Sequence, residues 1–290
     1  MNKYLVASII ALSILVIIFG RYQYEQKLSD ITTSAQQMLA DQVDNFSEEP
    51  EEINQEIIVE PSEDPELNSE EGDSSSEVEL DVLLEDTPSS LADRIEARLT
   101  ANETITILAF GSESLTDSQN EGLVPWPELF MEKINEAFST DLFVVETMSV
   151  GEMTSLDMVL QGVDQEVAEK NADIFLIEPL MWNDNGNVII DHSSDHLTTL
   201  MNSISEENDE AVIVINPSQP AYETVNYPDQ MESLRSLSIE NNYLFVDHWS
   251  DWPGIYEEDL LEYVDENDHR MPTQMGHEQW SESILSYFVN

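Results

Sequence analysis

The sequence has no cysteine and very few basic residues, and these two shortages exclude several classes of protein. Without cysteine the chain can form no disulfide, no thiolate metal site, no lipid-modified cysteine anchor and no cysteine nucleophile. Its 290 residues contain only 9 Lys and Arg against 61 Asp and Glu, a formal net charge of −52. Nucleic-acid binding needs clustered basic side chains that neutralise phosphates, so we expect no nucleic-acid partner. Such acidity is typical of a protein that stays soluble in a salty medium.

The N-terminal end carries the one long apolar run of the sequence. Residues 4–20 (YLVASIIALSILVIIFG) have no charge and reach the lower end of the roughly 17–25 residues that span a bilayer. No A-x-A-type cleavage site follows Gly20, which favours an uncleaved anchor over residues 1–27. We therefore expect a single-pass protein of the cell membrane with its large domain outside. Secretion after signal cleavage is the alternative.

Residues 28–100 read as an acidic spacer between this anchor and a folded domain. No Lys or Arg occurs from Ser29 to Asp93, while Glu, Asp, Ser and Pro abound. Such a segment repels itself and has little to bury, so we expect it to be largely disordered. Its last part, residues 89–99 (SSLADRIEARL), has the pattern of a short amphipathic helix with a serine N-cap.

Residues 101–290 show the pattern of an α/β domain. Short runs rich in Val, Ile and Phe are nearly continuous, as in parallel strands covered on both faces. These predicted strands are 104–110, 142–148, 173–180, 211–217 and 243–249, and helix-period segments at 126–138, 155–170, 194–207, 227–241 and 273–289 follow them in turn. The alternation predicts a doubly wound, five-stranded parallel sheet with helices on both faces. Sites in such sheets form at the carboxyl ends of strands.

Residues suited to nucleophilic catalysis lie at these strand ends and in the last loop. A hydroxyl nucleophile needs a base within hydrogen-bond reach, a carboxylate that orients the base, and donors where an oxyanion forms. Four loops can supply them, with these residues: Ser112 and Ser114; Gly151; Asn183; and Asp265, Glu266 and His269.

Three segments match sequence boxes of a known family. GSESLT resembles a G-D-S-L-T box with one residue inserted, WNDNG resembles a G-x-N-D box, and HRMPTQMGHEQW resembles an H-P-N-x-x-G-H-x-x-W-A tail. In this order across residues 101–290 they resemble the SGNH (GDSL-type) hydrolases, a family of esterases, lipases and carbohydrate acetylesterases. EPLMWNDNG further resembles the E-P-x-x-x-N-D-N-G box of a membrane-anchored or secreted Gram-positive subgroup.

The resemblance implies roles for the residues at the strand ends. A serine attacks, its N–H joins those of Gly151 and the Asn183 amide in an oxyanion hole, and His269 is the base. Aligning the box from its Leu-Thr side makes Ser114 the nucleophile. Aligning it from Gly111 puts Ser112 first and Glu113 in the usual nucleophile position.

Two residues could supply the carboxylate that orients the base. Asp265, four residues before His269, is the customary residue type, whereas Glu266 has the customary spacing of three. The family's third-box glycine is Met181 here, and Arg270 and Met271 separate His269 from Pro272. We expect no cofactor and no metal.

Three structural alternatives accompany this interpretation. His192 and His196, four residues apart in DHSSDH, could face a metal from one helix, although Asp191 or Ser193 also makes a natural N-cap. Four of the five tryptophans of the domain could line a carbohydrate groove but are more typical of packing: Trp126, Trp249, Trp252 and Trp280. His248 is likewise more typical of a structural residue.

The sequence thus predicts an extracytoplasmic serine hydrolase. The resemblance and the expected location together imply substrates that are acyl esters, O-acetyl esters among them, of envelope polymers, extracellular polysaccharide or small molecules. The alternative is a non-catalytic binding or envelope-assembly module that keeps the fold with a degenerate triad.

Overall fold

A computed structural model of the chain describes residues 80–268 and 271–289, which lie in one compact unit within Ser69–Asn290. The expected anchor at 4–20 and most of the expected spacer lie outside the described residues. Within the described part, no helix is both long enough and apolar enough to cross a membrane.

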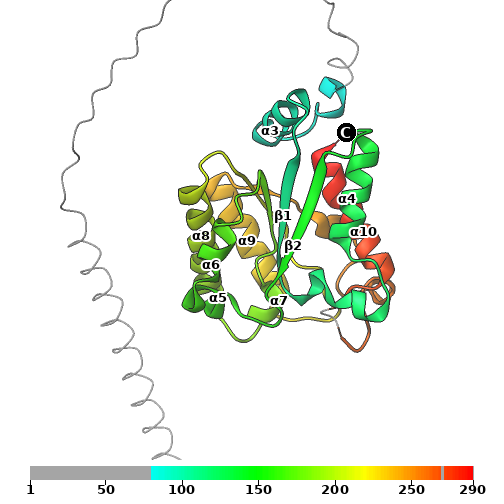
Figure 1. The fold of residues 1–290 in the computed structure, drawn as a ribbon. Coiled ribbons are helices and arrows are strands. Elements are labelled where there is room, and N and C mark those ends of the chain that lie inside the picture. The colour runs from blue at the N-terminus through cyan, green and yellow to red at the C-terminus, as the bar shows by residue number, and fades with distance from the viewer. Residues whose placement is uncertain (1–79, 269–270, 290) are drawn as a thin grey trace, which may run out of the picture. The chain divides into compact units, whose positions relative to one another are not determined.

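A five-stranded, all-parallel sheet forms the centre of the fold (Figure 1). The strands are β1 (Ile105–Gly111), β2 (Phe143–Ser149), β3 (Ile174–Ile177), β4 (Val212–Ile215) and β5 (Leu244–Phe245). Their order is β2-β1-β3-β4-β5, so the chain winds first to one side of β1 and then to the other. This arrangement confirms the predicted doubly wound parallel sheet.

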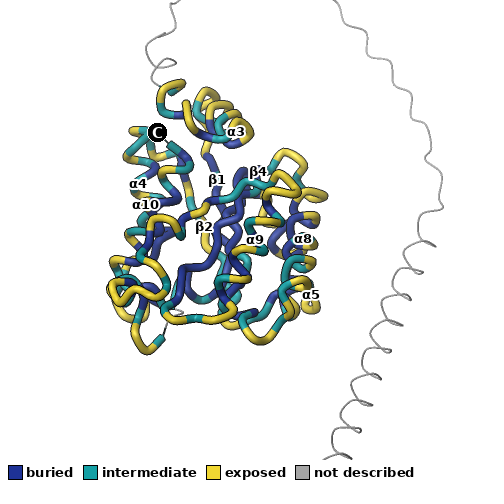
Figure 2. Tube along the Cα trace, turned by 180° about the vertical axis from the view of Figure 1, so that it is seen from behind, coloured by how far each residue is buried: buried dark blue, intermediate teal, exposed yellow. Residues whose placement is uncertain are grey.

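Helices cover both faces of the sheet (Figures 1 and 2). One face packs against α4 (Trp126–Ala137), α10 (Gln274–Phe288) and, from the amino-terminal side, α3 (Ser89–Thr100). The other packs against α5 (Ser155–Gln161), α6 (Val163–Ala168), α8 (Ile190–Glu207) and α9 (Tyr227–Asn241). Side chains alternate between the two faces along each strand, so residues two apart in a strand serve the same core.

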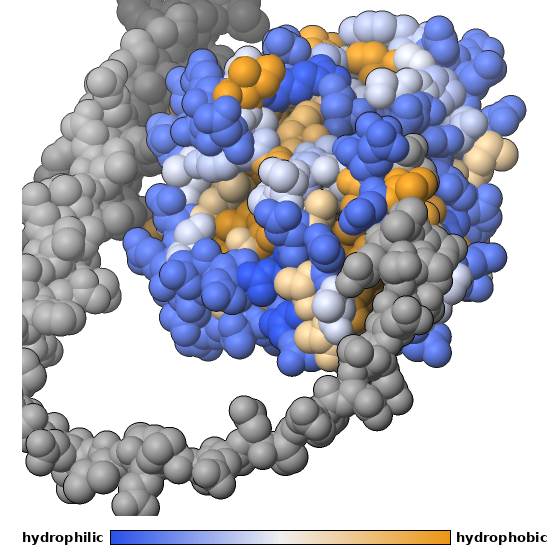
Figure 3. Space-filling model, turned by 90° about the horizontal axis from the view of Figure 1, so that it is seen from above, coloured by the Kyte–Doolittle hydropathy of each residue, from blue (hydrophilic) through white to orange (hydrophobic). Residues whose placement is uncertain are grey.

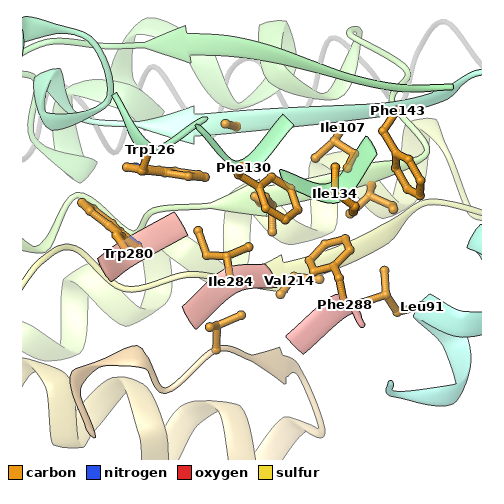
Figure 4. Packing of buried hydrophobic residues seen from close by; sticks show 14 of the residues in the cluster. Leu91, Ile107, Trp126, Phe130, Ile134, Phe143, Val214, Trp280, Ile284 and Phe288 are labelled. Atoms are coloured by element: carbon orange, nitrogen blue, oxygen red, sulfur yellow. The ribbon is translucent and has the colours of Figure 1, made fainter. Parts of the chain in front are cut away.

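The core between the sheet and the α4/α10 layer is rich in aromatic rings (Figure 4). Trp126 and Trp280 are fully buried and stack with ring centroids 5.4 Å apart, and Trp252 is buried beside Trp280. Trp249 is half-buried, and its indole N–H donates to the Ser218 carbonyl. These tryptophans therefore serve packing, and three of the four are closed to a carbohydrate.

The helix predicted at 89–99 belongs to the folded unit rather than to the spacer. Leu91 and Ile95 of α3 are fully buried, and Arg98 donates two hydrogen bonds to Asp173 Oδ1 (2.9 and 2.6 Å). The folded unit thus begins before residue 101. The expected serine cap is wrong, because the N-cap is Pro88 and no side chain caps the helix.

Two other helices differ from expectation at their ends. The helix expected over 155–170 is divided at Gly162, whose φ of +72° ends α5 with a left-handed residue. The helix expected from 194 begins at Ile190 instead. Its N-cap is Ile189, without a side-chain hydrogen bond, so neither Asp191 nor Ser193 is the cap.

Short elements that the sequence did not reveal complete the fold. They are α7 (Met181–Asp184) and the 3₁₀ helices η1 (Glu113–Leu115), η2 (Asp117–Glu121), η3 (His248–Asp251) and η4 (Glu258–Glu262). The face seen in Figure 3 is mostly hydrophilic with scattered apolar groups, in keeping with the acidic composition.

Candidate functional site

The candidate site lies at the carboxyl ends of β1 and β3. The chain order reverses about β1, because β2 pairs with one edge of β1 and β3 with the other. In open parallel sheets such a reversal leaves a crevice at the carboxyl edge, where ligands bind. The polypeptide leaves β1 at Ser112 and enters η1, and it leaves β3 at Glu178.

The two candidate serines contact each other and one carboxyl group. Ser112 Oγ lies 2.9 Å from Ser114 Oγ, and it lies 3.0 and 2.9 Å from the two carboxyl oxygens of Glu178. Ser114 Oγ lies 3.4 Å from Glu178 Oε2. The Ser112 N–H also donates to Glu178 Oε2 (2.7 Å), so the turn after β1 is fixed to the end of β3.

Glu178 is the centre of this cluster, and reasoning from the sequence missed it. Its side chain is buried, and a third hydroxyl, Ser218 Oγ after β4, donates to Oε1. Burial raises the pKa of Glu178, while the hydrogen bonds from Ser218 and Ser112 act in the opposite direction. None of the ion pairs of the described residues involves Glu178.

Gly111 makes room for this carboxyl group. A Cβ at Gly111 would overlap Glu178 Oε2 and would lie 2.6 Å from Glu178 Cβ and 2.5 Å from Leu115 Cδ1. The glycine that precedes the serines is therefore required by the close approach of β3, and not by a turn with positive φ.

The loop after β2 closes against the same cluster. Ser149 Oγ donates to the Ser112 carbonyl (2.9 Å), and the Gly151 N–H donates to Ser149 Oγ (3.2 Å). The Asn183 amide nitrogen donates to the carbonyls of Gly151 (2.8 Å) and Met153 (2.9 Å). Asn183 thus ties α7 to this loop with both of its amide protons, and its oxyanion-hole role stays a prediction.

The last predicted loop is described up to Asp268 and again from Met271. Asp265 Oδ1 accepts the N–H groups of Asn267 (2.7 Å) and Asp268 (2.8 Å), and Glu266 is exposed. Asp265 N–H donates to the Met271 carbonyl (3.0 Å), which joins the described residues on the two sides of this segment. His269 lies outside the described residues, and its role as base stays a prediction together with that of its carboxylate partner.

The histidine pair considered for a metal has a different local role. The rings of His192 and His196 lie 6.5 Å apart, and His196 Nδ1 lies 2.9 Å from Ser155 Oγ at the start of α5. Asp184 accepts the Ser155 N–H (2.8 Å) and the Ser193 hydroxyl (2.5 Å). No group of three or more acidic or histidine side chains with metal-binding geometry occurs among the described residues.

Two further histidines are buried near the aromatic core. His248 stacks on Trp280 and its Nε2 lies 2.7 Å from the Pro217 carbonyl, while His277 Nδ1 accepts the Trp126 N–H (3.2 Å). Burial lowers the pKa of each to about 4, so both are neutral at neutral pH. This environment agrees with a structural role for His248.

Comparison with solved structures finds proteins of similar fold, among them an esterase. A carbohydrate esterase of family 3 from Talaromyces cellulolyticus aligns with a TM-score of 0.51 at 13% identity, covering 63% of this chain and 95% of that one. Protein YXIM from Bacillus subtilis aligns with a TM-score of 0.51 at 13% identity, covering 63% and 56%. An acetylxylan esterase from Geobacillus stearothermophilus, solved as a catalytic mutant, aligns with a TM-score of 0.48 at 14% identity, covering 64% and 94%.

Comparison of the sequence alone finds no relative. No protein-family model matches the chain, and no curated protein sequence matches it either. At such low identity the structural likeness shows the fold alone, an α/β fold with a five-stranded parallel sheet.

Proposed function

We propose that this protein is a serine hydrolase that cleaves acyl esters through an acyl-enzyme. The observation that carries the proposal is the Ser112–Ser114–Glu178 cluster, in which two hydroxyl groups at the switch point of the sheet contact a buried carboxyl group. Hydroxyl groups next to a proton acceptor are what a nucleophilic serine requires. The sheet edge that bears them is also where ligands bind in this class of fold.

The substrate class follows from the likeness to esterases and from the N-terminal sequence. One structure of the same fold is a carbohydrate esterase, so we propose acyl esters, including O-acetyl esters, of carbohydrate or other small alcohols. The uncharged run at 4–20 supports a single-pass anchor with the hydrolase outside the cell membrane. Envelope polymers or extracellular polysaccharide would then be within reach of the domain.

The reaction needs a nucleophile and a place for the oxyanion. One serine attacks the ester carbonyl, the alcohol leaves, and water hydrolyses the acyl-enzyme. The backbone donors that the resemblance implies are the N–H groups of the attacking serine and of Gly151. The Ser114 N–H donates to Ser112 Oγ (3.3 Å) and the Gly151 N–H to Ser149 Oγ (3.2 Å), so an oxyanion would replace these hydroxyl acceptors. His269 is the base that the resemblance implies, and Glu178 is a second proton acceptor, in contact with the hydroxyl groups.

A fluorophosphonate tests this function directly. The purified full chain is treated with the probe, and the adduct is located by peptide mass spectrometry. An adduct on Ser112 or Ser114 is the expected result, because the probe reacts only with an activated serine. If a known serine hydrolase in the same tube is labelled and this chain is not, the proposal is refuted.

A specific observation favours a second function, a non-catalytic binding or assembly module. Ser112 and Ser114 are only 3% and 2% exposed, and the Asn183 amide is occupied by two backbone carbonyls. A site closed in this way would hold the loops together rather than receive an ester. An unlabelled but folded chain would refute the first function and favour the second.

A further inference from the structure

We propose that Ser114 is the attacking residue, that Ser112 relays its proton, and that Glu178 accepts it. This inference rests on the proposed function and assigns separate roles to the two serines. It also gives Glu178 the proton acceptance that the family resemblance gives to His269.

The distances place the Ser112 hydroxyl between the Ser114 hydroxyl and the carboxyl group of Glu178. Ser112 Oγ is within 3.0 Å of both oxygens of Glu178, whereas Ser114 Oγ is 3.4 Å from the nearer oxygen and 2.9 Å from Ser112 Oγ. Hydroxyl hydrogen bonds are formed at about 2.5–3.0 Å, so the direct contact of Ser114 with Glu178 is weak. Ser114 therefore reaches the carboxyl group through Ser112.

The count of donors and acceptors agrees with this order. A serine hydroxyl has one proton to donate and two lone pairs to accept with. Ser112 Oγ accepts the Ser114 N–H (3.3 Å), which leaves one lone pair for the Ser114 hydroxyl and one proton for Glu178. The proton and both lone pairs of Ser112 Oγ are thereby used, and the chain of hydrogen bonds runs from the Ser114 hydroxyl through Ser112 to Glu178.

The remaining contacts of Glu178 fix its carboxyl group in place. Oε2 accepts the Ser112 N–H (2.7 Å) and Oε1 accepts the Ser218 hydroxyl. The first of these is a backbone contact, which holds the carboxyl against the turn regardless of how the Ser112 hydroxyl rotates. Burial raises the pKa of Glu178, and a carboxylate of raised pKa is a stronger base near neutral pH.

The proton and the electron pairs balance over one cycle. Ser114 Oγ bonds to the acyl carbon while its proton passes to Ser112 Oγ and the Ser112 proton passes to Glu178. Collapse of the tetrahedral intermediate breaks the bond to the alcohol, and the alcohol leaves with the proton that Glu178 returns through Ser112, while Ser114 keeps the acyl group. Water then attacks the acyl carbon, gives its proton to the relay, and Ser114 leaves with that proton.

The rate of fluorophosphonate labelling as a function of pH tests these roles in the full chain. In the wild type we expect the adduct on Ser114. We expect Ser112→Ala to keep the adduct on Ser114 and to react at least ~10-fold more slowly, since general base catalysis contributes about 10²–10⁴-fold. In the wild type the labelling rate should rise with pH as Glu178 loses its proton, and this rise is the pH step. Glu178→Gln should react slowly and lack the pH step, whereas His269→Gln should keep it.

A matched control separates this role from simple loss of a buried hydrogen bond. Ser203 is a buried serine whose hydroxyl donates to the buried carboxylate of Asp164 (2.8 Å), away from the site. Ser203→Ala should lower stability about as much as Ser112→Ala does and should leave the labelling rate unchanged. Ser112→Ala removes only one oxygen, so it remains informative if Glu178→Gln fails to fold.

The outcomes distinguish this inference from the proposed function. If the wild type is not labelled, the proposed function itself fails. If the wild type is labelled on Ser112, if Ser112→Ala reacts at the wild-type rate, or if the pH step is lost in His269→Gln instead, only the present inference is overturned.

Discussion

Replacing Gly111 by alanine would test whether the end of β1 is built around Glu178. The added Cβ would overlap Glu178 Oε2 and would lie 2.6 Å from Glu178 Cβ and 2.5 Å from Leu115 Cδ1. Rotating the carboxyl group away would break its contact with the Ser112 N–H. Because the Cβ of Glu178 is fixed to β3, rotation alone cannot relieve the overlap, and the backbone must shift as well.

The size of the effect follows from these two consequences. Overpacking in a dense core costs about 1–3 kcal/mol. Leaving the buried Ser112 N–H without its acceptor costs about 1–3 kcal/mol more. We therefore expect Gly111→Ala to lower the free energy of unfolding by about 3 kcal/mol or more, and to slow fluorophosphonate labelling because Glu178 is displaced.

Urea unfolding of the full chain, followed by far-UV circular dichroism, measures this change. Gly254→Ala is the matched control, because its Cβ would meet nothing closer than Glu257 Cδ at 3.4 Å, an ordinary contact. The control should stay within about 0.5 kcal/mol of the wild type. If Gly111→Ala is no more destabilising than Gly254→Ala, the close approach of Glu178 to β1 is wrong.

Three further changes probe the rest of the fold. Gly276→Ala would place a Cβ against the Tyr263 carbonyl oxygen, so we expect a loss of about 1–3 kcal/mol in urea unfolding. Asp173→Ala would leave Arg98 of α3 without its main partner; we expect a loss of about 2 kcal/mol, less than for a fully buried pair, and faster amide exchange in α3. The pKa of His248 is about 4 when folded and 6.5 otherwise, so the unfolded chain binds the extra proton. Stability should fall by about 3 kcal/mol between pH 6.5 and 4, and His248→Gln should lack this part of the pH dependence.

The strands could be predicted because their physics is local. β1, β3 and β4 are covered on both faces, so their sequences are nearly continuous apolar runs. The run at 243–249 was the least well predicted, since only Leu244 and Phe245 near its start form β5 and pair with β4. β5 lies at the edge of the sheet, where one side of the strand lacks a partner strand to extend the ladder.

The ends of helices were predicted less well because packing decides them. Ser89 and Ser193 both have cap chemistry, yet α3 begins after Pro88 and α8 begins four residues earlier than expected. Ser193 instead donates to Asp184. Contacts with distant segments thus override the local preference of a serine for the N-cap.

Within the site, the sequence located the loops but not the group at their centre. Ser112, Ser114, Gly151 and Asn183 were expected at strand ends, and hydrogen bonds do join their three loops. Glu178 was missed because a glutamate before a proline at a strand end usually reads as solvated. Its burial depends on Gly111, and that contact between separate strands leaves no periodic signal.

Two buried carboxyl groups of this protein have hydrogen-bond partners of different kinds, and the difference bears on function. Asp173 accepts hydrogen bonds from the guanidinium of Arg98, whose proton is held too tightly to be exchanged in a reaction. Glu178 accepts hydrogen bonds from the hydroxyl groups of Ser112 and Ser218 and from one backbone N–H. Hydroxyl partners stabilise a carboxylate less than an arginine does, but they leave it able to take up a proton. A buried acid with such partners lowers the stability of the fold. It lies beside Gly111, a glycine that only the close approach of the acid explains, and both features are expected where the acid takes part in proton transfer.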